Sequence, residues 1–156
     1  MWRLLTFALL ALTFRSAVGG PGETAEGRWL TQGKSAVVEI YRCGDAALCG
    51  RLLWLRMKPV DREHNPQATD IHNPDPSLRS RPLCGLTIMS GFHANGPDRW
   101  EGGSLYDPES GNTYRGRISL NLDGTLSLRG YVGIPLFGRG EEWTRFTQGI
   151  GRCPGE

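Results

Sequence analysis

A segment dense in polar side chains, DIHNPDPSLRSRPLCGL, runs from Asp70 to Leu86 and holds the residues best suited to chemistry. Paired carboxylates can act as the acid and base of a hydrolase. The polar motif of this segment consists of Asp70, Asn73, Asp75, Arg79 and Arg81. Spacing alone does not bring two carboxylates together. The favoured interpretation is therefore turn formation and pairing of the two arginines with the two aspartates, and no catalytic residue is assigned.

Other chemistry has weaker support. Serines near His72 and His93 lack the G-x-S-x-G elbow of a serine nucleophile. The histidines and cysteines are not at zinc-ligand spacing. A Ca²⁺ site would need the fixed register of a known calcium loop, which is missing from the candidate ligands Asp61, Asp70, Asn73 and Asp75. No metal and no cofactor are predicted.

The local sequence of the motif indicates a stiff connection. Each residue that precedes a proline is biased away from helical geometry, which applies to Asn73 and Asp75. Asp75 is then suited to cap a short helix that has Pro76 at its first position, and Pro82 would end it. We expect this segment to cross from one strand to another as a rigid unit with one short helix.

The rest of the mature sequence alternates short apolar-polar runs with turn signals. Residues 112–121 and 124–133 show period-two alternation, and Asp123-Gly124 between them is a strong hairpin signal. We predict strands near 27–31, 35–43, 48–56, 84–92, 98–106, 112–121, 124–133 and 141–147. Only the connection from Met57 to Pro82 is long. This pattern predicts an all-β fold, a single antiparallel barrel of about eight strands, because closure removes exposed sheet edges.

The phase of the strands predicts which side chains enter the barrel. Alternation puts Trp100, Gly102 and Tyr106 on one face, and Leu126, Leu128 and Val132 on one face of a later strand. A ligand site in the barrel would then be lined by Trp100, Tyr106, Tyr114, Ile118 and Leu128. The same residues could instead fill a compact core, and the sequence leaves both interpretations open.

The first residues have the features of a secretory signal peptide. Arg3 gives a positive start, an apolar run follows, and the small residues Ala17-Val18-Gly19 fit a cleavage site. We therefore predict a signal peptide at about residues 1–19 and a domain at 20–156, with no membrane span after its removal. Loss of two of the 18 basic residues leaves 16, equal to the 16 acidic ones, which argues against a nucleic-acid surface and against an electrostatic membrane anchor.

Four cysteines follow the export signal, so disulfides are the default. Three pairings are possible. We favour Cys43–Cys49, which closes a short turn, together with Cys84–Cys153, which would tie the C-terminal tail to the body.

Three motifs resemble a bacterial family of exported proteins known only as a domain of unknown function. They are the polar segment, WEGGSLYDPESGNTYRGRISL and LSLRGYVGIPLFGRGEEWTR. The resemblance covers about residues 27–146 and implies a lipocalin-like (calycin) barrel, without an activity. Such barrels carry Gly-x-Trp on the first strand and an arginine on the last. Here Gly27-Arg28-Trp29 and Arg145 match that pair, so the resemblance implies that Arg145 stacks on Trp29 and closes one barrel end.

These observations predict a periplasmic or secreted bacterial protein, more plausibly a binding protein than an enzyme. The preferred function is non-catalytic binding of a small, partly apolar ligand in the barrel. The alternative is an envelope or extracellular interaction protein with a filled barrel, using the surfaces around residues 65–82 and 134–139. A hydrolase that uses loop carboxylates ranks third.

Overall fold

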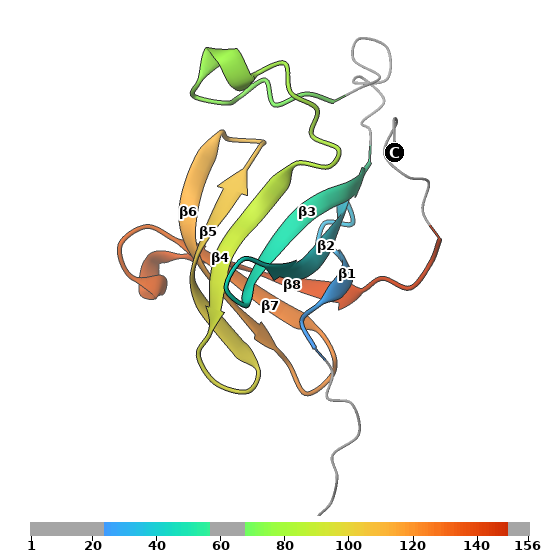
Figure 1. The fold of residues 1–156 in the computed structure, drawn as a ribbon, viewed down its shortest axis with the longest axis vertical. Coiled ribbons are helices and arrows are strands. Elements are labelled where there is room, and N and C mark those ends of the chain that lie inside the picture. The colour runs from blue at the N-terminus through green and yellow to red at the C-terminus, as the bar shows by residue number, and fades with distance from the viewer. Residues whose placement is uncertain (1–23, 57–67, 150–156) are drawn as a thin grey trace, which may run out of the picture.

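The fold is a closed antiparallel barrel of eight strands, seen in a computed structural model that describes residues 24–56 and 68–149 (Figure 1). Each strand pairs with its neighbour in the chain, and β1 pairs with β8 to close the barrel. The strands are β1 (Gly27–Leu30), β2 (Ala36–Cys43), β3 (Ala47–Leu55), β4 (Thr87–Ala94), β5 (Arg99–Asp107), β6 (Asn112–Leu120), β7 (Leu126–Tyr131) and β8 (Arg139–Arg145). The predicted all-β barrel is confirmed.

Turn chemistry positions the strands as the sequence indicates. In the β6–β7 hairpin, the Asp123 carboxylate accepts hydrogen bonds from the backbone N–H and the hydroxyl of Thr125, at 3.0 and 2.7 Å. These bonds hold the pKa of Asp123 below its usual value. Gly124 follows with φ +80°, a conformation that glycine adopts without strain. The hairpin register pairs Leu120 with Leu126 directly across the turn.

The long connection between β3 and β4 contains the predicted short helix, a 3-10 turn named η1 (Pro76–Leu78). Asp75 caps it and accepts hydrogen bonds from the backbone N–H and hydroxyl of Ser77, at 2.9 and 2.7 Å. Figure 1 shows this connection beyond the end of the barrel from which β3 leaves and β4 returns. A second 3-10 turn, η2 (Pro135–Phe137), lies between β7 and β8 and was not predicted.

Large apolar side chains fill the centre of the barrel. Phe92 on β4 is fully buried and is packed against a glycine on β5 and a glycine on β6. A Cβ atom added at Gly103 would lie 2.2 Å from the Phe92 ring, and one at Gly116 would lie 2.6 Å from it. The other large inward residues include Trp29, Met89, Leu105, Ile118, Leu126 and Trp143. The glycines therefore make room for Phe92, and the packing there is tight.

A β-bulge in β5 changes which of its side chains face inward, so one prediction from the alternation is wrong. The β5–β6 register shifts between Glu101 and Gly103, with Gly102 at φ +78°, as in a bulge that adds one residue to a strand. Trp100 faces inward beside Ile118, and after the bulge Leu105 faces inward. Tyr106 therefore lies on the opposite face, and the expectation that it shares a face with Trp100 is wrong.

The end of β7 corrects a second face. The alternation placed Val132 with Leu126 and Leu128, but β7 ends at Tyr131. Val132 is 73% exposed, in the connection to β8.

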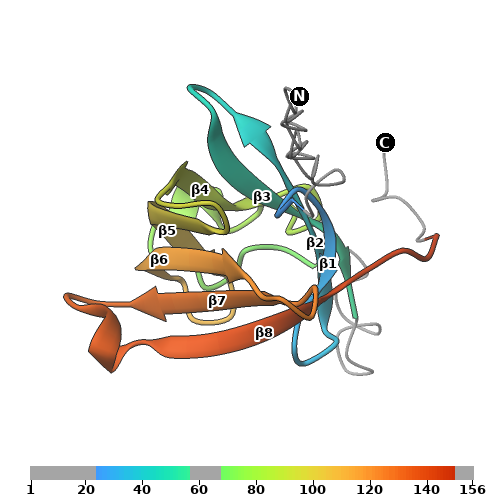
Figure 2. The ribbon, with the colours of Figure 1, turned by 90° about the horizontal axis from the view of Figure 1, so that it is seen from below.

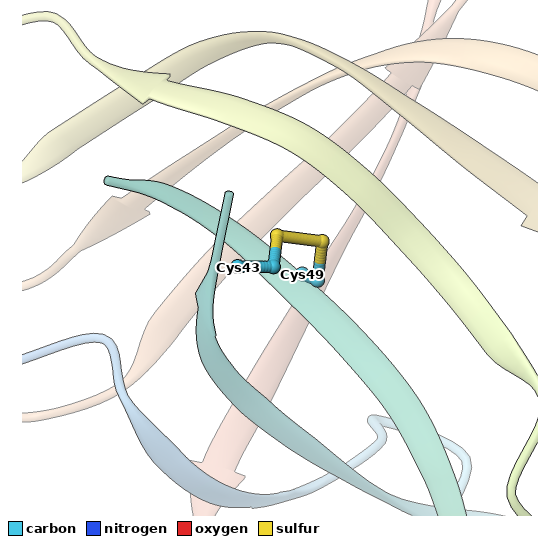
Figure 3. The surroundings of a disulfide bond; sticks show 2 residues. All are labelled: Cys43 and Cys49. Atoms are coloured by element: carbon cyan, nitrogen blue, oxygen red, sulfur yellow. A yellow bond between two sulfur atoms is a disulfide. The ribbon is translucent and has the colours of Figure 1, made fainter. Parts of the chain in front are cut away.

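The turn between β2 and β3 is closed by the predicted Cys43–Cys49 disulfide (Figure 3). Cys84 is also disulfide-bonded, and its predicted partner, Cys153, lies outside the described residues, as do the signal-peptide residues 1–19. A disulfide suggests an oxidising, extracytoplasmic environment. Within residues 24–56 and 68–149, no helix has the length and apolar character needed to span a membrane.

Candidate functional site

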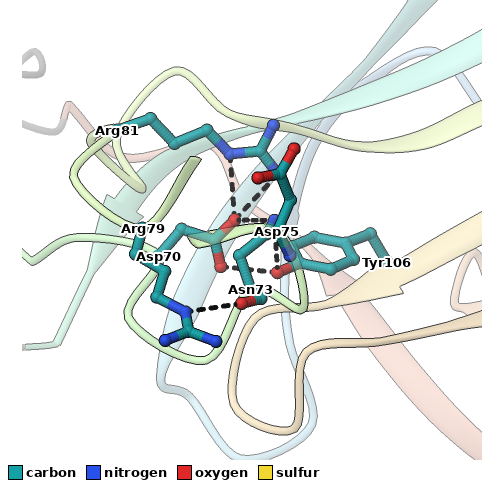
Figure 4. A network of polar contacts seen from close by, with 6 residues as sticks. All are labelled: Asp70, Asn73, Asp75, Arg79, Arg81 and Tyr106. Carbon is teal, nitrogen blue, oxygen red and sulfur yellow. Dashed lines mark hydrogen bonds and ion pairs between the residues drawn. The ribbon is translucent and has the colours of Figure 1, made fainter. Parts of the chain in front are cut away.

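The polar motif forms a buried network that joins the long connection to β5 (Figure 4). The Asp70 side chain is fully buried. One of its oxygens accepts the Tyr106 hydroxyl at 2.6 Å, and the other accepts Asn73 Nδ2 at 2.8 Å and Arg81 Nε at 2.9 Å. The second Arg81 nitrogen lies 2.8 Å from the same carboxylate. Asp70 thus binds two positions of its own segment and one strand of the barrel.

The protonation state of the network follows from these contacts. Burial alone would raise the pKa of Asp70, but the hydrogen bonds from Tyr106, Asn73 and Arg81, with the Arg81 charge, outweigh it and lower the pKa. Burial, followed by the contact with the Asp70 carboxylate, raises the pKa of Tyr106. At neutral pH the network therefore holds an ionised Asp70, paired with the Arg81 guanidinium, and a neutral Tyr106.

The motif's other members also have structural partners. Asn73 Oδ1 accepts the backbone N–H of Asp75 at 2.9 Å, and its backbone carbonyl accepts Arg79 Nε at 2.8 Å. The hydrogen bonds from Ser77 lower the pKa of Asp75. Arg81 forms the predicted ion pair with Asp70, whereas Arg79 donates to a backbone oxygen.

Carboxylates outside the motif serve turns and strand edges. Asp107 accepts from the Glu109 backbone and the Ser110 hydroxyl, at 2.9 and 2.6 Å, and Glu101 accepts from the Asn95 amide at 3.0 Å. In the part of the chain that the structure describes, no three His, Cys, Asp or Glu residues cluster as metal ligands. Asp61, one of the candidate calcium ligands, lies outside it. This arrangement favours structural roles for the carboxylates.

Four of the five predicted ligand-lining residues lie on the inner face of adjacent strands. Trp100, Ile118 and Leu128 are direct cross-strand neighbours on β5, β6 and β7. Tyr114 lies further along β6, opposite Leu105. Ile118 is buried, whereas Trp100, Tyr114 and Leu128 pack on the core and remain half-buried. These three side chains therefore keep part of their surface exposed to solvent.

The same inner row ends in a carboxylate that was not among the predicted site residues. Glu141 on β8 pairs with Leu128 and accepts the indole N–H of Trp143 at 2.7 Å. The sequence contained a signal for this carboxylate. Glu141 and Trp143 are two residues apart on one strand, and residues i and i+2 of a strand share a face. The row therefore combines an apolar wall with one negative group at its edge.

At the barrel end opposite the long connection, Arg145 stacks on Trp29 as predicted. Trp29 is fully buried and donates its indole N–H to the Ala25 carbonyl at 2.8 Å. The Arg145 guanidinium lies 4.0 Å from the Trp29 ring centroid and donates to the carbonyls of Glu26 and Thr24 at 2.7 and 2.6 Å. The stack and the forked hydrogen bonds fix the segment before β1 across this end.

A groove of about 520 Å³ lies along β5 to β8. Its lining includes Ile118, Leu128 and Glu141, which also belong to the inner row. Three arginines and three glutamates contribute to its lining: Arg99, Arg117, Arg129, Glu101, Glu141 and Glu142. These charges balance, so the groove as a whole has no electrostatic preference for an anion or a cation.

A comparison with protein families matches residues 27–145 to a family described as "Uncharacterized protein conserved in bacteria (DUF2147)". The chain belongs to this family. The match spans all eight strands and the long connection that carries the Asp70 network. The family description assigns no activity. A comparison with curated proteins found no match.

Among solved structures, the chain is similar to a Helicobacter pylori protein, HP1028, described as belonging to the lipocalin family. The identity is 24%, the TM-score is 0.67, and the alignment covers 78% of this chain and 82% of the other. This similarity supports the lipocalin-like fold. Ligand binding is compatible with such a barrel, and it requires evidence from the chain's own residues.

Proposed function

We propose that this protein is an exported bacterial binding protein that holds a small, partly apolar molecule in its barrel without catalysing a reaction. The observation that carries the proposal is the inner row Trp100–Ile118–Leu128, which is half-buried at Trp100 and Leu128 and is continued by Glu141. An apolar wall with one polar group is the usual composition of a small-molecule site. The ligand would place its apolar part on the wall and a hydrogen-bond donor near Glu141.

Binding is preferred to hydrolysis because the motif's carboxylates are already engaged. Asp70 is buried in an ion pair, and Asp75 caps η1. Export is supported by the signal-peptide pattern at residues 1–19 and by the Cys43–Cys49 disulfide, which together favour the periplasm or the exterior.

The packing of Phe92 against Gly103 and Gly116 favours a second candidate, an envelope or extracellular interaction protein with a filled barrel. Such a protein would use its loop surfaces, around residues 65–82 and 134–139. The two candidates differ in one measurable property, the presence of a stoichiometric small molecule.

The test is mass spectrometry of a denatured extract from natively purified protein. Leu128→Gln places a polar side chain on the inner wall, and Arg115→Gln places the same side chain on the outer face of the adjacent strand, outside the groove. We expect one compound at about equimolar amounts from the wild type and from Arg115→Gln, and a several-fold smaller amount from folded Leu128→Gln. Absence of any stoichiometric compound from the wild type would reject the ligand proposal and favour the filled barrel.

A further inference from the structure

The connection between β7 and β8 exposes an unusual amount of apolar surface. We define the β7–β8 tip as residues 132–138. Val132, Ile134, Leu136 and Phe137 within it are 73%, 54%, 75% and 79% exposed. Single exposed apolar residues are normal on a protein surface, but four in six consecutive residues form a patch that indicates a binding role.

Specific contacts hold the tip in one shape. The Arg129 side chain donates to the carbonyls of Pro135 and Leu136, at 2.5 and 3.1 Å. Within η2, the N–H of Phe137 binds the Ile134 carbonyl and the N–H of Gly138 binds the Pro135 carbonyl, at 3.3 and 3.2 Å. The backbone of Gly138 also packs closely on Gly130, where an added Cβ would lie 2.5 Å from the carbonyl oxygen. The apolar side chains are therefore presented on a fixed turn.

We propose that the β7–β8 tip inserts into the interfacial layer of an anionic lipid membrane. The shape fits, because the tip projects beyond the neighbouring strands (Figure 2). The backbone fits as well, because the carbonyls of Ile134, Pro135 and Leu136 all accept hydrogen bonds from the protein. Backbone groups that are already paired do not oppose transfer out of water.

The charges around the tip match an anionic surface. Arg129 and Arg139 flank it on the two strands, and Arg115 pairs in register with Tyr131 at its base. The sequence from Arg129 to Gly140 contains no acidic residue, and the acidic pair Glu141-Glu142 follows on β8, outside the tip. Arginines beside an inserted apolar segment can keep their charged heads among lipid phosphates. The near-neutral balance of the mature chain argues against attraction of the whole protein to an anionic membrane. The three arginines beside the tip can still attract anionic lipids locally.

A lipid surface is preferred to a protein partner because the patch is small and convex. A specific protein interface normally takes about 800 Å² from each partner, supplied by about 20–30 residues. The tip offers a single turn, whereas insertion into a soft apolar phase needs no matching surface. Apolar side chains of this size, with basic flanks, are typical of interfacial membrane binding.

Vesicle flotation tests the proposal on the full mature protein. The vesicles are phosphatidylcholine alone, or phosphatidylcholine mixed with phosphatidylglycerol. We expect wild-type protein to float with the mixed vesicles more than with phosphatidylcholine alone. The double variant Leu136→Ser/Phe137→Ser should partition roughly 10- to 100-fold less, since it loses two exposed apolar side chains from the inserted surface. Both residues are exposed, so the variant should keep the wild-type melting temperature.

Leu122→Ser is the matched control, because Leu122 is an exposed leucine in the turn between β6 and β7, outside the tip. This variant should float as the wild type does. Arg139→Gln should reduce flotation with the mixed vesicles and change little with phosphatidylcholine. The proposal is overturned if the wild type floats with neither vesicle, a result that would favour a protein as the partner of the tip. It is also overturned if the tip variant floats as well as Leu122→Ser. The co-purification test of the barrel ligand is independent of either result.

Discussion

Replacing Gly103 with alanine is expected to destabilise the barrel through a direct clash with Phe92. An ideal Cβ at this position lies 2.2, 2.4 and 2.5 Å from three atoms of the Phe92 ring. Gly103 is not among the glycines with positive φ, so the cost is steric. Phe92 is fully buried and is also confined by Gly116. Overpacking of a core typically costs about 1–3 kcal/mol, and we expect the upper part of this range.

A second substitution should relieve the clash if the reasoning is right. Phe92→Leu shortens the side chain that the new methyl group meets, at a cost of its own of roughly 1–2 kcal/mol for lost packing. In that background Gly103→Ala should cost clearly less than in the wild type. The two substitutions should therefore couple favourably, within the range of about 0.5–3 kcal/mol seen for residues in contact.

The assay is urea denaturation followed by tryptophan fluorescence, with the disulfides kept oxidised. Gly140→Ala is the matched control, because Gly140 is also a strand glycine without positive φ and its added Cβ would meet no atom closer than 3.7 Å. We expect it to change stability by less than about 0.5 kcal/mol. The account of a filled barrel centre would be refuted if Gly103→Ala were as mild as Gly140→Ala, or if its cost were unchanged in the Phe92→Leu background.

Two further predictions concern the contacts at the two ends of the barrel. The folded-state pKa of Asp70 is lowered, so its stabilising effect is present at neutral pH and is lost as the pH falls through that pKa, below about pH 4. Asp70→Asn should cost about 2 kcal/mol at pH 7, a value reduced because Arg81 is one-third exposed. The free energy of unfolding of this variant should also change less between pH 7 and pH 3.5 than that of the wild type. Urea denaturation at the two pH values measures this change, and an equal change in variant and wild type would contradict the prediction. Arg145→Lys should cost roughly 1–2 kcal/mol, because lysine cannot stack flat on Trp29 and bind two carbonyls at once; an unchanged denaturation midpoint would contradict it.

Local signals in the sequence predicted the barrel well. Alternation located the strands to within a few residues, because a half-buried strand must alternate wherever one face meets the core. Asp123-Gly124 and Asp75-Pro76 predicted a hairpin and a capped turn, since both depend on neighbours within a few residues. The Cys43–Cys49 pair was predictable because its two residues flank one short turn.

The missed features depend on contacts between distant segments. The bulge at Gly102 reversed the face of Tyr106, and only the β5–β6 register reveals it. Asp70 meets Tyr106 across 36 positions of sequence, a contact that no local pattern contains. The space for Phe92 comes from glycines on two other strands, so the sequence left open whether the barrel centre was filled.

Asp70 and the β7–β8 tip both depart from the rule that apolar side chains are buried and polar ones are exposed. The first departure indicates a structural role, and the second indicates a binding surface. Asp70 is a charged group at full burial, but each of its oxygens has donors and its charge is paired with Arg81. A buried polar group whose hydrogen bonds are all made has a structural role, and here Asp70 fixes the long connection to β5. The β7–β8 tip is the reverse case, because Leu136 and Phe137 are apolar and are 75% and 79% exposed. Arg129 holds the turn that exposes these side chains. The exposed apolar surface of the tip is therefore better evidence for a binding partner than the buried polar motif is.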